Sequence, residues 1–76
     1  MEEKIKKIVE SVVMGFDASK LGPGDNFKEA GIDSLDIFSI IMEVQNEFGV
    51  QVSDDEAEEC NSIGAIIAML EKKQAA

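Results

Sequence analysis

The stretch Gly31-Ile32-Asp33-Ser34-Leu35-Asp36 decides the fold, because a turn-rich segment ends there and a long apolar helix begins. Asp33 or Ser34 can accept a hydrogen bond from a backbone N–H of the first helical turn, as N-cap residues do. The same residues place the Ser34 hydroxyl between the carboxylates of Asp33 and Asp36 at the N-terminus of a helix, which suits a surface attachment point. Most Asp-Ser pairs at helix starts act only as caps, so the rest of the chain has to decide between the two interpretations.

Residues 34–48 are predicted to form this helix, with apolar side chains in two separate stripes. The first stripe spans an arc of about 100° on a helical wheel and is typical of a core-facing surface; it contains Ile37, Ile40, Ile41, Val44 and Phe48. The second stripe lies roughly 130° away on the same wheel and contains Leu35, Phe38 and Met42. Two interpretations of this second stripe stay open: it is covered by the preceding loop, or it is an exposed patch for partner proteins.

The remaining chain predicts three more helices, over residues 2–14, 54–60 and 62–73. Ser53 and Glu56 have capping-box spacing at the start of the short third helix, and Asn61 or Ser62 caps the last one. The glycine-rich segment 15–33 is a long loop, with room for one helical turn over 26–30 and with these expected anchors in the core: Phe16, Leu21, Phe27 and Ile32. We therefore expect a single domain over residues 1–76 with an all-α fold. It is a small four-helix bundle with three main helices, one short helix and a long loop between the first and second helices.

Charge and composition exclude several classes of function. Sixteen acidic residues against 7 basic ones give a net charge of −9, which disfavours nucleic acid and anionic membranes and favours enzymes with basic patches. The chain has no histidine, and the acidic run 54–59 lacks the spacing of a calcium loop, so we expect no resident metal and no catalysis. One cysteine, Cys60, cannot form an internal disulfide. Without a secretory signal or an apolar span, the expected protein is a cytoplasmic monomer.

The motif Gly31-Ile32-Asp33-Ser34-Leu35-Asp36 resembles the phosphopantetheine-attachment motif of acyl carrier proteins. The likeness extends over the whole chain in its length, its acidity and the order of its helices. The resemblance implies that a phosphopantetheinyl transferase moves 4′-phosphopantetheine from coenzyme A to Ser34, with Mg²⁺ needed only for this attachment and Asp33 helping to position it. The arm then carries acyl groups as thioesters in fatty acid, lipid or polyketide biosynthesis, and presents them to acyl-transfer, synthase and condensing enzymes.

The resemblance also implies a partner surface and a cavity. Leu35 and Met42 match positions that the family uses for partner contact, and the expected surface is completed by Asp36, Phe38, Glu43 and Glu47. Cys60 and Ile66 fall where the family lines its acyl cavity, and the expected lining is completed by Ile40 and Val44. The helix carries Ser39, Gln45 and Asn46 where family members often have glutamates, which suggests a carrier for a specialised pathway. Two other classes, an aminoacyl or peptidyl carrier and an interaction module without the arm, are disfavoured by Asp33, the acidity and the intact serine.

Overall fold

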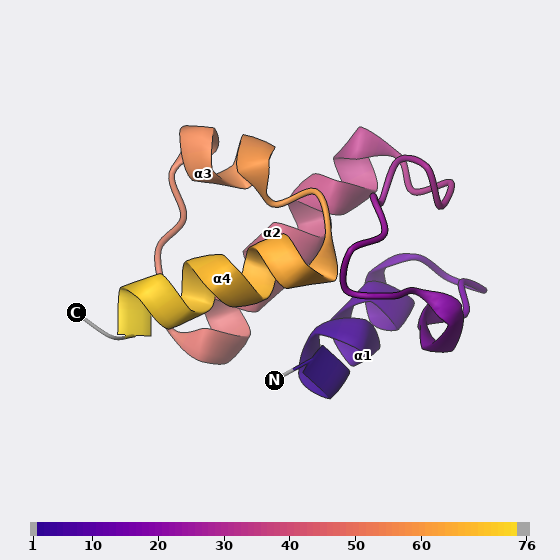
Figure 1. Ribbon diagram of the computed structural model, residues 1–76, viewed down its shortest axis with the longest axis horizontal. Coiled ribbons are helices and arrows are strands. Elements are labelled where there is room, and N and C mark those ends of the chain that lie inside the picture. Colours follow the sequence, from indigo (N-terminus) through magenta and orange to yellow (C-terminus); the bar gives the residue numbers. More distant parts are fainter. Residues whose placement is uncertain (1, 75–76) are drawn as a thin grey trace.

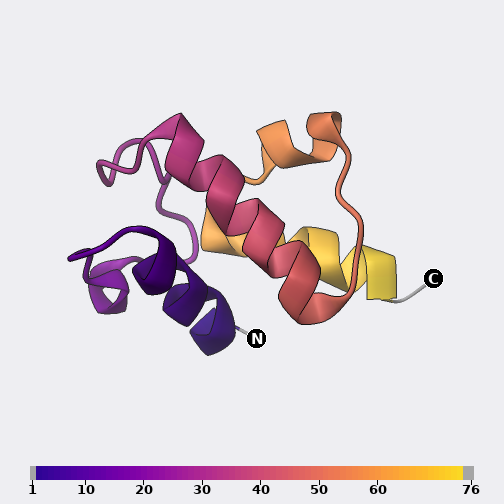
Figure 2. The same ribbon diagram turned by 180° about the vertical axis from the view of Figure 1, so that it is seen from behind.

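The computed structural model describes residues 2–74, and this part of the chain contains four α-helices, a 3-10 turn and no strand. In chain order the elements are α1 (Glu2–Val12), η1 (Ala18–Lys20), α2 (Ser34–Phe48), α3 (Asp54–Glu59) and α4 (Ile63–Gln74). Figures 1 and 2 show α1 and the short α3 on opposite sides of α2 and α4. The predicted all-α bundle of three main helices and one short helix is confirmed.

Helix α2 has the predicted bounds because both of its ends carry strong signals. Asp33 has extended backbone angles (φ −68°, ψ 152°), and its Oδ1 accepts a long hydrogen bond of 3.5 Å from the Leu35 N–H, so Asp33 is the N-cap. Gly49 ends the helix in the left-handed conformation (φ 66°), which glycine adopts without strain, and its N–H donates to the Gln45 carbonyl at 2.9 Å.

The other helices differ from their predicted ranges by one or two residues. Helix α1 ends at Val12, not at residue 14, although the Val13 N–H still donates to the Val9 carbonyl at 2.8 Å. Helix α3 ends at Glu59, since Cys60 has left the helical conformation (φ −83°, ψ 65°). Helix α4 starts at Ile63 and runs one residue past the predicted end, to Gln74.

The predicted caps of the last two helices are present. Ser53 and Glu56 form the complete capping box: the Glu56 N–H donates to Ser53 Oγ at 3.2 Å, and the Ser53 N–H donates to Glu56 Oε1 at 3.0 Å. Of the two candidates for α4, Ser62 provides the cap, since its Oγ accepts from the Ala65 N–H at 3.1 Å.

All four helices contribute side chains to one mainly aliphatic core. Helix α1 packs against both α2 and α4. The most deeply buried helical residues are Ile5, Val9, Ile40, Val44, Ile63, Ile66 and Leu70. Of the predicted core stripe of α2, four residues are buried and Phe48 is half-buried. There the Lys4 ammonium lies 5.9 Å from the centre of the Phe48 ring, a cation–π contact between α1 and α2.

The loop between α1 and α2 is tied to α1 through the buried Ala18, whose N–H donates to Glu10 Oε2 at 3.0 Å, and to α4 through its second half. Leu21, Phe27 and Ile32 are buried as predicted, whereas Phe16 is half-buried. The Phe27 N–H donates to the Asn61 carbonyl at 2.8 Å, and a second backbone bond of the same length joins the start of α4 to the Pro23 carbonyl. Residues 26–30 make one helical turn, closed by a bond from the Ala30 N–H to the Asn26 carbonyl at 3.0 Å. The second half of the loop is therefore held in place near the N-terminal end of α2, where Ser34 lies.

Candidate phosphopantetheine attachment site

Ser34 is the first residue of α2, and its side chain is exposed to solvent. Its Oγ donates a weak hydrogen bond of 3.4 Å to Asp33 Oδ1. Because Asp33 is the N-cap, the Ser34 hydroxyl is free of the capping role that the sequence left open for either residue. The N-terminus of a helix also carries a partial positive charge and free N–H groups, so a phosphate diester on Ser34 would lie in a favourable place for an anion.

A pocket of about 420 Å³ opens beside Ser34, between α2, α3 and the loop. Its apolar part is formed by Ile37, Phe38, Ile41, Ala57 and Cys60. Its polar part is formed by Asn26, Lys28, Glu58 and Asn61, together with Ser34 itself. An exposed hydroxyl beside a mostly apolar pocket can carry a long arm whose thiol holds an apolar group. The arm can stay in water while the apolar group leaves water and enters the pocket.

The structure places the four expected cavity residues in two groups. Cys60 lines the pocket beside Ser34. Ile40, Val44 and Ile66 are fully buried in the core and do not line that pocket. Ile37 and Ile41 were not predicted as pocket residues, although their spacing from Ser34 (i+3 and i+7) places them on the same side of α2. Ala57, the small residue of α3 that faces them, gave no signal of its own.

The second apolar stripe of α2 is exposed, not covered by the loop. Leu35 is 74% exposed, Phe38 52% and Met42 59%, and we call these three residues the α2 patch. Of the acidic residues expected around it, Glu43 and Glu47 are exposed and Asp36 is half-buried. Glu47 is also 4.0 Å from the Lys4 ammonium. Phe38 belongs both to the α2 patch and to the pocket lining, so a protein that covers the patch also contacts the pocket wall.

Cys60 is buried at the end of α3, with its Sγ 3.5 Å from the Met69 Sδ. Burial raises the pKa of the Cys60 thiol, and the carboxylates of Glu56 and Glu59 raise it further, with a smaller opposite effect of Lys73. At neutral pH the side chain is therefore a protonated thiol, a poor nucleophile that behaves as a small hydrophobic group.

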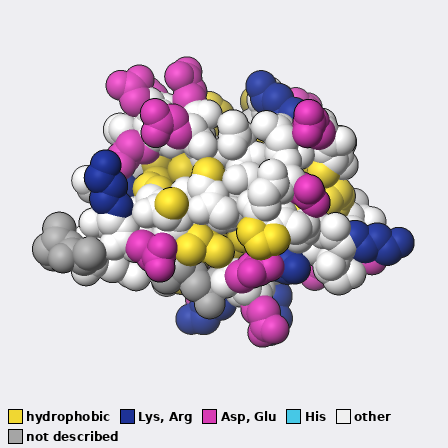
Figure 3. Space-filling model, viewed as in Figure 1, with side chains coloured by type: hydrophobic (Ala, Val, Ile, Leu, Met, Phe, Trp, Pro, Cys, Tyr) yellow, Lys and Arg dark blue, Asp and Glu magenta, His cyan; other side chains and the backbone are white. Residues whose placement is uncertain are grey.

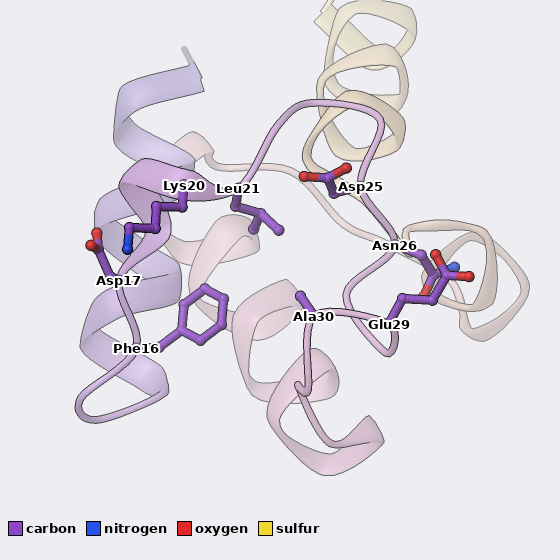
Figure 4. A pocket seen from close by; sticks show the side chains of 8 residues that line it. All are labelled: Phe16, Asp17, Lys20, Leu21, Asp25, Asn26, Glu29 and Ala30. Atoms are coloured by element: carbon purple, nitrogen blue, oxygen red, sulfur yellow. The ribbon is translucent and has the colours of Figure 1, made fainter.

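A second pocket, of about 400 Å³, lies in the loop (Figure 4). Phe16, Leu21 and Ala30 form its apolar part. Two of its three carboxylates already accept hydrogen bonds within the loop: Asp17 accepts the Ser19 N–H, and Asp25 accepts the Gly22 N–H at 2.8 Å. Ser34 does not line this pocket, and we assign it no role.

Comparisons with known proteins show the family of the chain. The family described as "Phosphopantetheine attachment site" matches residues 3–70. An "Acyl carrier protein" of Solidesulfovibrio magneticus is 37% identical over 73 residues, which cover 95% of this chain and 92% of the relative. An "Acyl carrier protein" of Sinorhizobium fredii is 39% identical over 74 residues, which cover 96% of this chain and 94% of the relative.

The chain therefore belongs to the acyl carrier protein family, whose members carry acyl groups on a covalently attached 4′-phosphopantetheine. Such a protein is a carrier rather than a catalyst, and it interacts with synthase and transferase enzymes. None of the helices within residues 2–74 is long and apolar enough to cross a membrane.

Proposed function

We propose that Ser34 is the residue that carries the phosphopantetheine arm of this acyl carrier. The observation that supports this most strongly is the exposed hydroxyl at the start of α2, beside an apolar pocket of about 420 Å³. In the attachment step, Ser34 Oγ forms a bond to the phosphorus that bears pantetheine in coenzyme A. The pyrophosphate bond breaks, adenosine 3′,5′-bisphosphate leaves, and the serine proton passes to a base of the phosphopantetheinyl transferase.

In this proposal Asp33 helps to position Mg²⁺ during the attachment, and the pocket holds the acyl chain. Asp33 and Asp36 add negative charge beside the incoming diphosphate, so a Mg²⁺ ion supplied with coenzyme A would lower their repulsion during transfer. The arm supplies the terminal thiol on which an acyl group is held as a thioester. Each methylene of that acyl chain that leaves water for the pocket contributes about 0.8 kcal/mol. The chain is thus protected between enzymes by an interaction that remains reversible.

The α2 patch and the net charge of −9 support a proposal about partners. The partners are the phosphopantetheinyl transferase and acyl-transfer, synthase and condensing enzymes with basic patches around an apolar contact. The opposite charges attract over a distance, and Leu35, Phe38 and Met42 supply the desolvated centre of the contact. Residues 1–76 act in this proposal as one non-catalytic carrier domain, monomeric and cytoplasmic.

The pathway in which the carrier acts is proposed to be a specialised one of fatty acid, lipid or polyketide biosynthesis. The side chains Ser39 and Asn46 are exposed on α2, where acidic residues would strengthen the attraction to a basic partner. The exposed surface around the α2 patch is therefore less acidic than it would be with glutamates at positions 39 and 46. If housekeeping fatty-acid synthase enzymes turn over this carrier as fast as their own, the specialised pathway is wrong.

One experiment tests the attachment directly. The protein is incubated with coenzyme A, Mg²⁺ and a broad-specificity phosphopantetheinyl transferase, and its mass is then measured. We expect a gain of one phosphopantetheine group, no gain in Ser34→Ala, and the full gain in the control Ser39→Ala, which removes another exposed hydroxyl of α2. A gain that survives Ser34→Ala, or no gain in the wild-type protein, contradicts the proposal.

A further inference from the structure

Lys28 lies in the loop before α2, and its side chain lines the same pocket as Ser34. Among the described residues that line this pocket, Lys28 carries the only positive charge and Glu58 the only negative charge. Asp33 and Asp36 lie on either side of Ser34 in the sequence, and Asp33 Oδ1 is 3.4 Å from the Ser34 Oγ. Figure 3 shows the wider surroundings, with acidic side chains gathered over α3 and few basic side chains on the same face of the molecule. A phosphate diester on Ser34 would therefore lie among carboxylates, with Lys28 as the cation of the pocket.

The backbone beside Lys28 is held in place by hydrogen bonds. The Phe27 N–H donates to the Asn61 carbonyl at 2.8 Å, and the Ile32 N–H donates to the Phe27 carbonyl at 2.9 Å. The second of these bonds joins the segment that carries Lys28 to the residues just before Ser34. The base of the Lys28 side chain therefore has a fixed position relative to Ser34, while its flexible stem lets the ammonium turn toward an anion.

The Lys28 ammonium is available for such an anion. Three ion pairs are formed within residues 2–74, and they use Lys4, Lys6 and Lys73. Lys28 is exposed and takes part in none of them. A phosphate diester is anionic at neutral pH, and its free oxygens accept strong hydrogen bonds from an ammonium. Pairing of Lys28 with this group would therefore break no ion pair of the fold.

We propose that Lys28 binds the phosphate diester that joins the arm to Ser34, and that this ion pair holds the first bonds of the arm against the loop. The inference rests on the proposed attachment at Ser34. Lys28 is then a positioning residue of the carrier itself. An enzyme that draws the arm into its own active site has to replace Lys28 at the phosphate by one of its own cations, so the basic patch of a partner competes with this lysine.

The test reads geometry, because an exposed ion pair contributes little to stability and is weakened by salt. The protein is used with its arm attached and without an acyl group, and the arm is followed by ³¹P and ¹H NMR. We expect nuclear Overhauser contacts between the ε-methylene protons of Lys28 and the geminal methyl groups of the arm next to the phosphate. Raising sodium chloride to about 1 M, where the Debye length is about 3 Å, should weaken these contacts and move the ³¹P resonance.

Matched variants separate the ion pair from a general effect of charge. Lys28→Gln removes the charge and keeps most of the stem, whereas Lys28→Arg keeps the charge. Lys20→Gln changes the net charge equally in the same loop, but Lys20 lines the other pocket, which does not include Ser34 (Figure 4). Both lysines are exposed, so the three variants should fold. We expect the ³¹P resonance to move to about its high-salt position in Lys28→Gln and to stay close to that of the wild type in Lys28→Arg and Lys20→Gln.

Several results would overturn the inference. They are an identical ³¹P resonance in the wild type and Lys28→Gln, equal shifts in Lys28→Gln and Lys20→Gln, and a shift in Lys28→Gln that Lys28→Arg shares, which would indicate a displaced loop. Failure of the proposed function appears earlier, as a protein that gains no arm at Ser34, and the inference then falls with it. If the arm attaches and the contacts with Lys28 are absent, only the inference is lost.

Discussion

Replacement of Gly64 by alanine should destabilise the protein by detaching the loop from α4. A Cβ at position 64 would lie 2.8 Å from the Pro23 carbonyl oxygen, a contact with backbone that no side-chain rotation can relieve. The same oxygen accepts the Gly64 N–H at 2.8 Å, so the loop cannot move away without weakening that hydrogen bond.

The size of the effect follows from two destabilising contributions and one stabilising contribution. Overpacking typically costs about 1–3 kcal/mol, and a weakened hydrogen bond costs about 0.5–1.5 kcal/mol. Alanine gains up to about 1 kcal/mol over glycine inside a helix, and less at position 64, which is the second residue of α4. We expect a net loss of about 1–4 kcal/mol, which lowers the melting temperature by roughly 5–30 °C in a domain of this size.

The assay is urea and thermal unfolding followed by far-ultraviolet circular dichroism, with Gly24→Ala as the matched control. Gly24 lies in the same loop, but a Cβ there meets nothing within 4 Å, so the control should stay within about 0.5 kcal/mol of the wild type. Hydrogen exchange at the amide of residue 64 should also become faster in Gly64→Ala. A variant that is as stable as the wild type would refute the argument that this close approach holds the loop.

Three further predictions concern charge, reactivity and partner contact. Hydrogen bonds from the Ser53 backbone and from Lys73 hold the pKa of Glu56 below its ordinary value, so this carboxylate stabilises the fold above its unfolded pKa and the effect is lost as the pH falls through the folded pKa. Between about pH 5 and pH 3 the urea midpoint of the wild type should therefore fall relative to that of Glu56→Gln; parallel curves would contradict this. Because the pKa of Cys60 is raised, iodoacetamide at neutral pH should alkylate the free thiol of the arm much faster than Cys60, as peptide mapping can show; equal rates would contradict the burial argument. Met42→Gln removes an exposed apolar side chain without adding charge, so stability should change by less than about 0.5 kcal/mol while the KM of acyl-transfer enzymes for the carrier rises; an unchanged KM would exclude Met42 from the contact.

The sequence predicted the helices best where the local chemistry at their ends is unambiguous. Helix α2 lies between Asp33 and Gly49, which act as caps, so its bounds could be derived. The end of α1 was less predictable, because Val13 continues the apolar pattern and packs on the core beyond the last helical residue. Periodicity reports which side chains are buried and does not report where the backbone turns.

The proposed attachment residue could also be identified from the sequence, whereas the shape of the pocket could not. Ser34 could be singled out because its neighbours and the layout of the chain resemble a known motif. A pocket depends on which side chains leave space between elements distant in sequence. Ala57 on α3 and Ile41 on α2 line such a space; the periodicity of α2 marks Ile41 only as a core residue, and Ala57 carried no signal of its own. That Ile40, Val44 and Ile66 contact an acyl chain stays a prediction.

The uneven attachment of the loop between α1 and α2 has a practical consequence for labelling and engineering. Its second half is held by backbone bonds to Asn61 and Gly64, so insertions there would displace the walls of the pocket. The start of the loop is open: Met14 is 90% exposed, and a Cβ added at Gly15 would meet nothing within 4 Å. A fluorophore attached to Met14→Cys before the arm is added, or a short peptide epitope inserted beside it, should therefore report on the carrier as it moves between enzymes without disturbing the surface proposed for their contact.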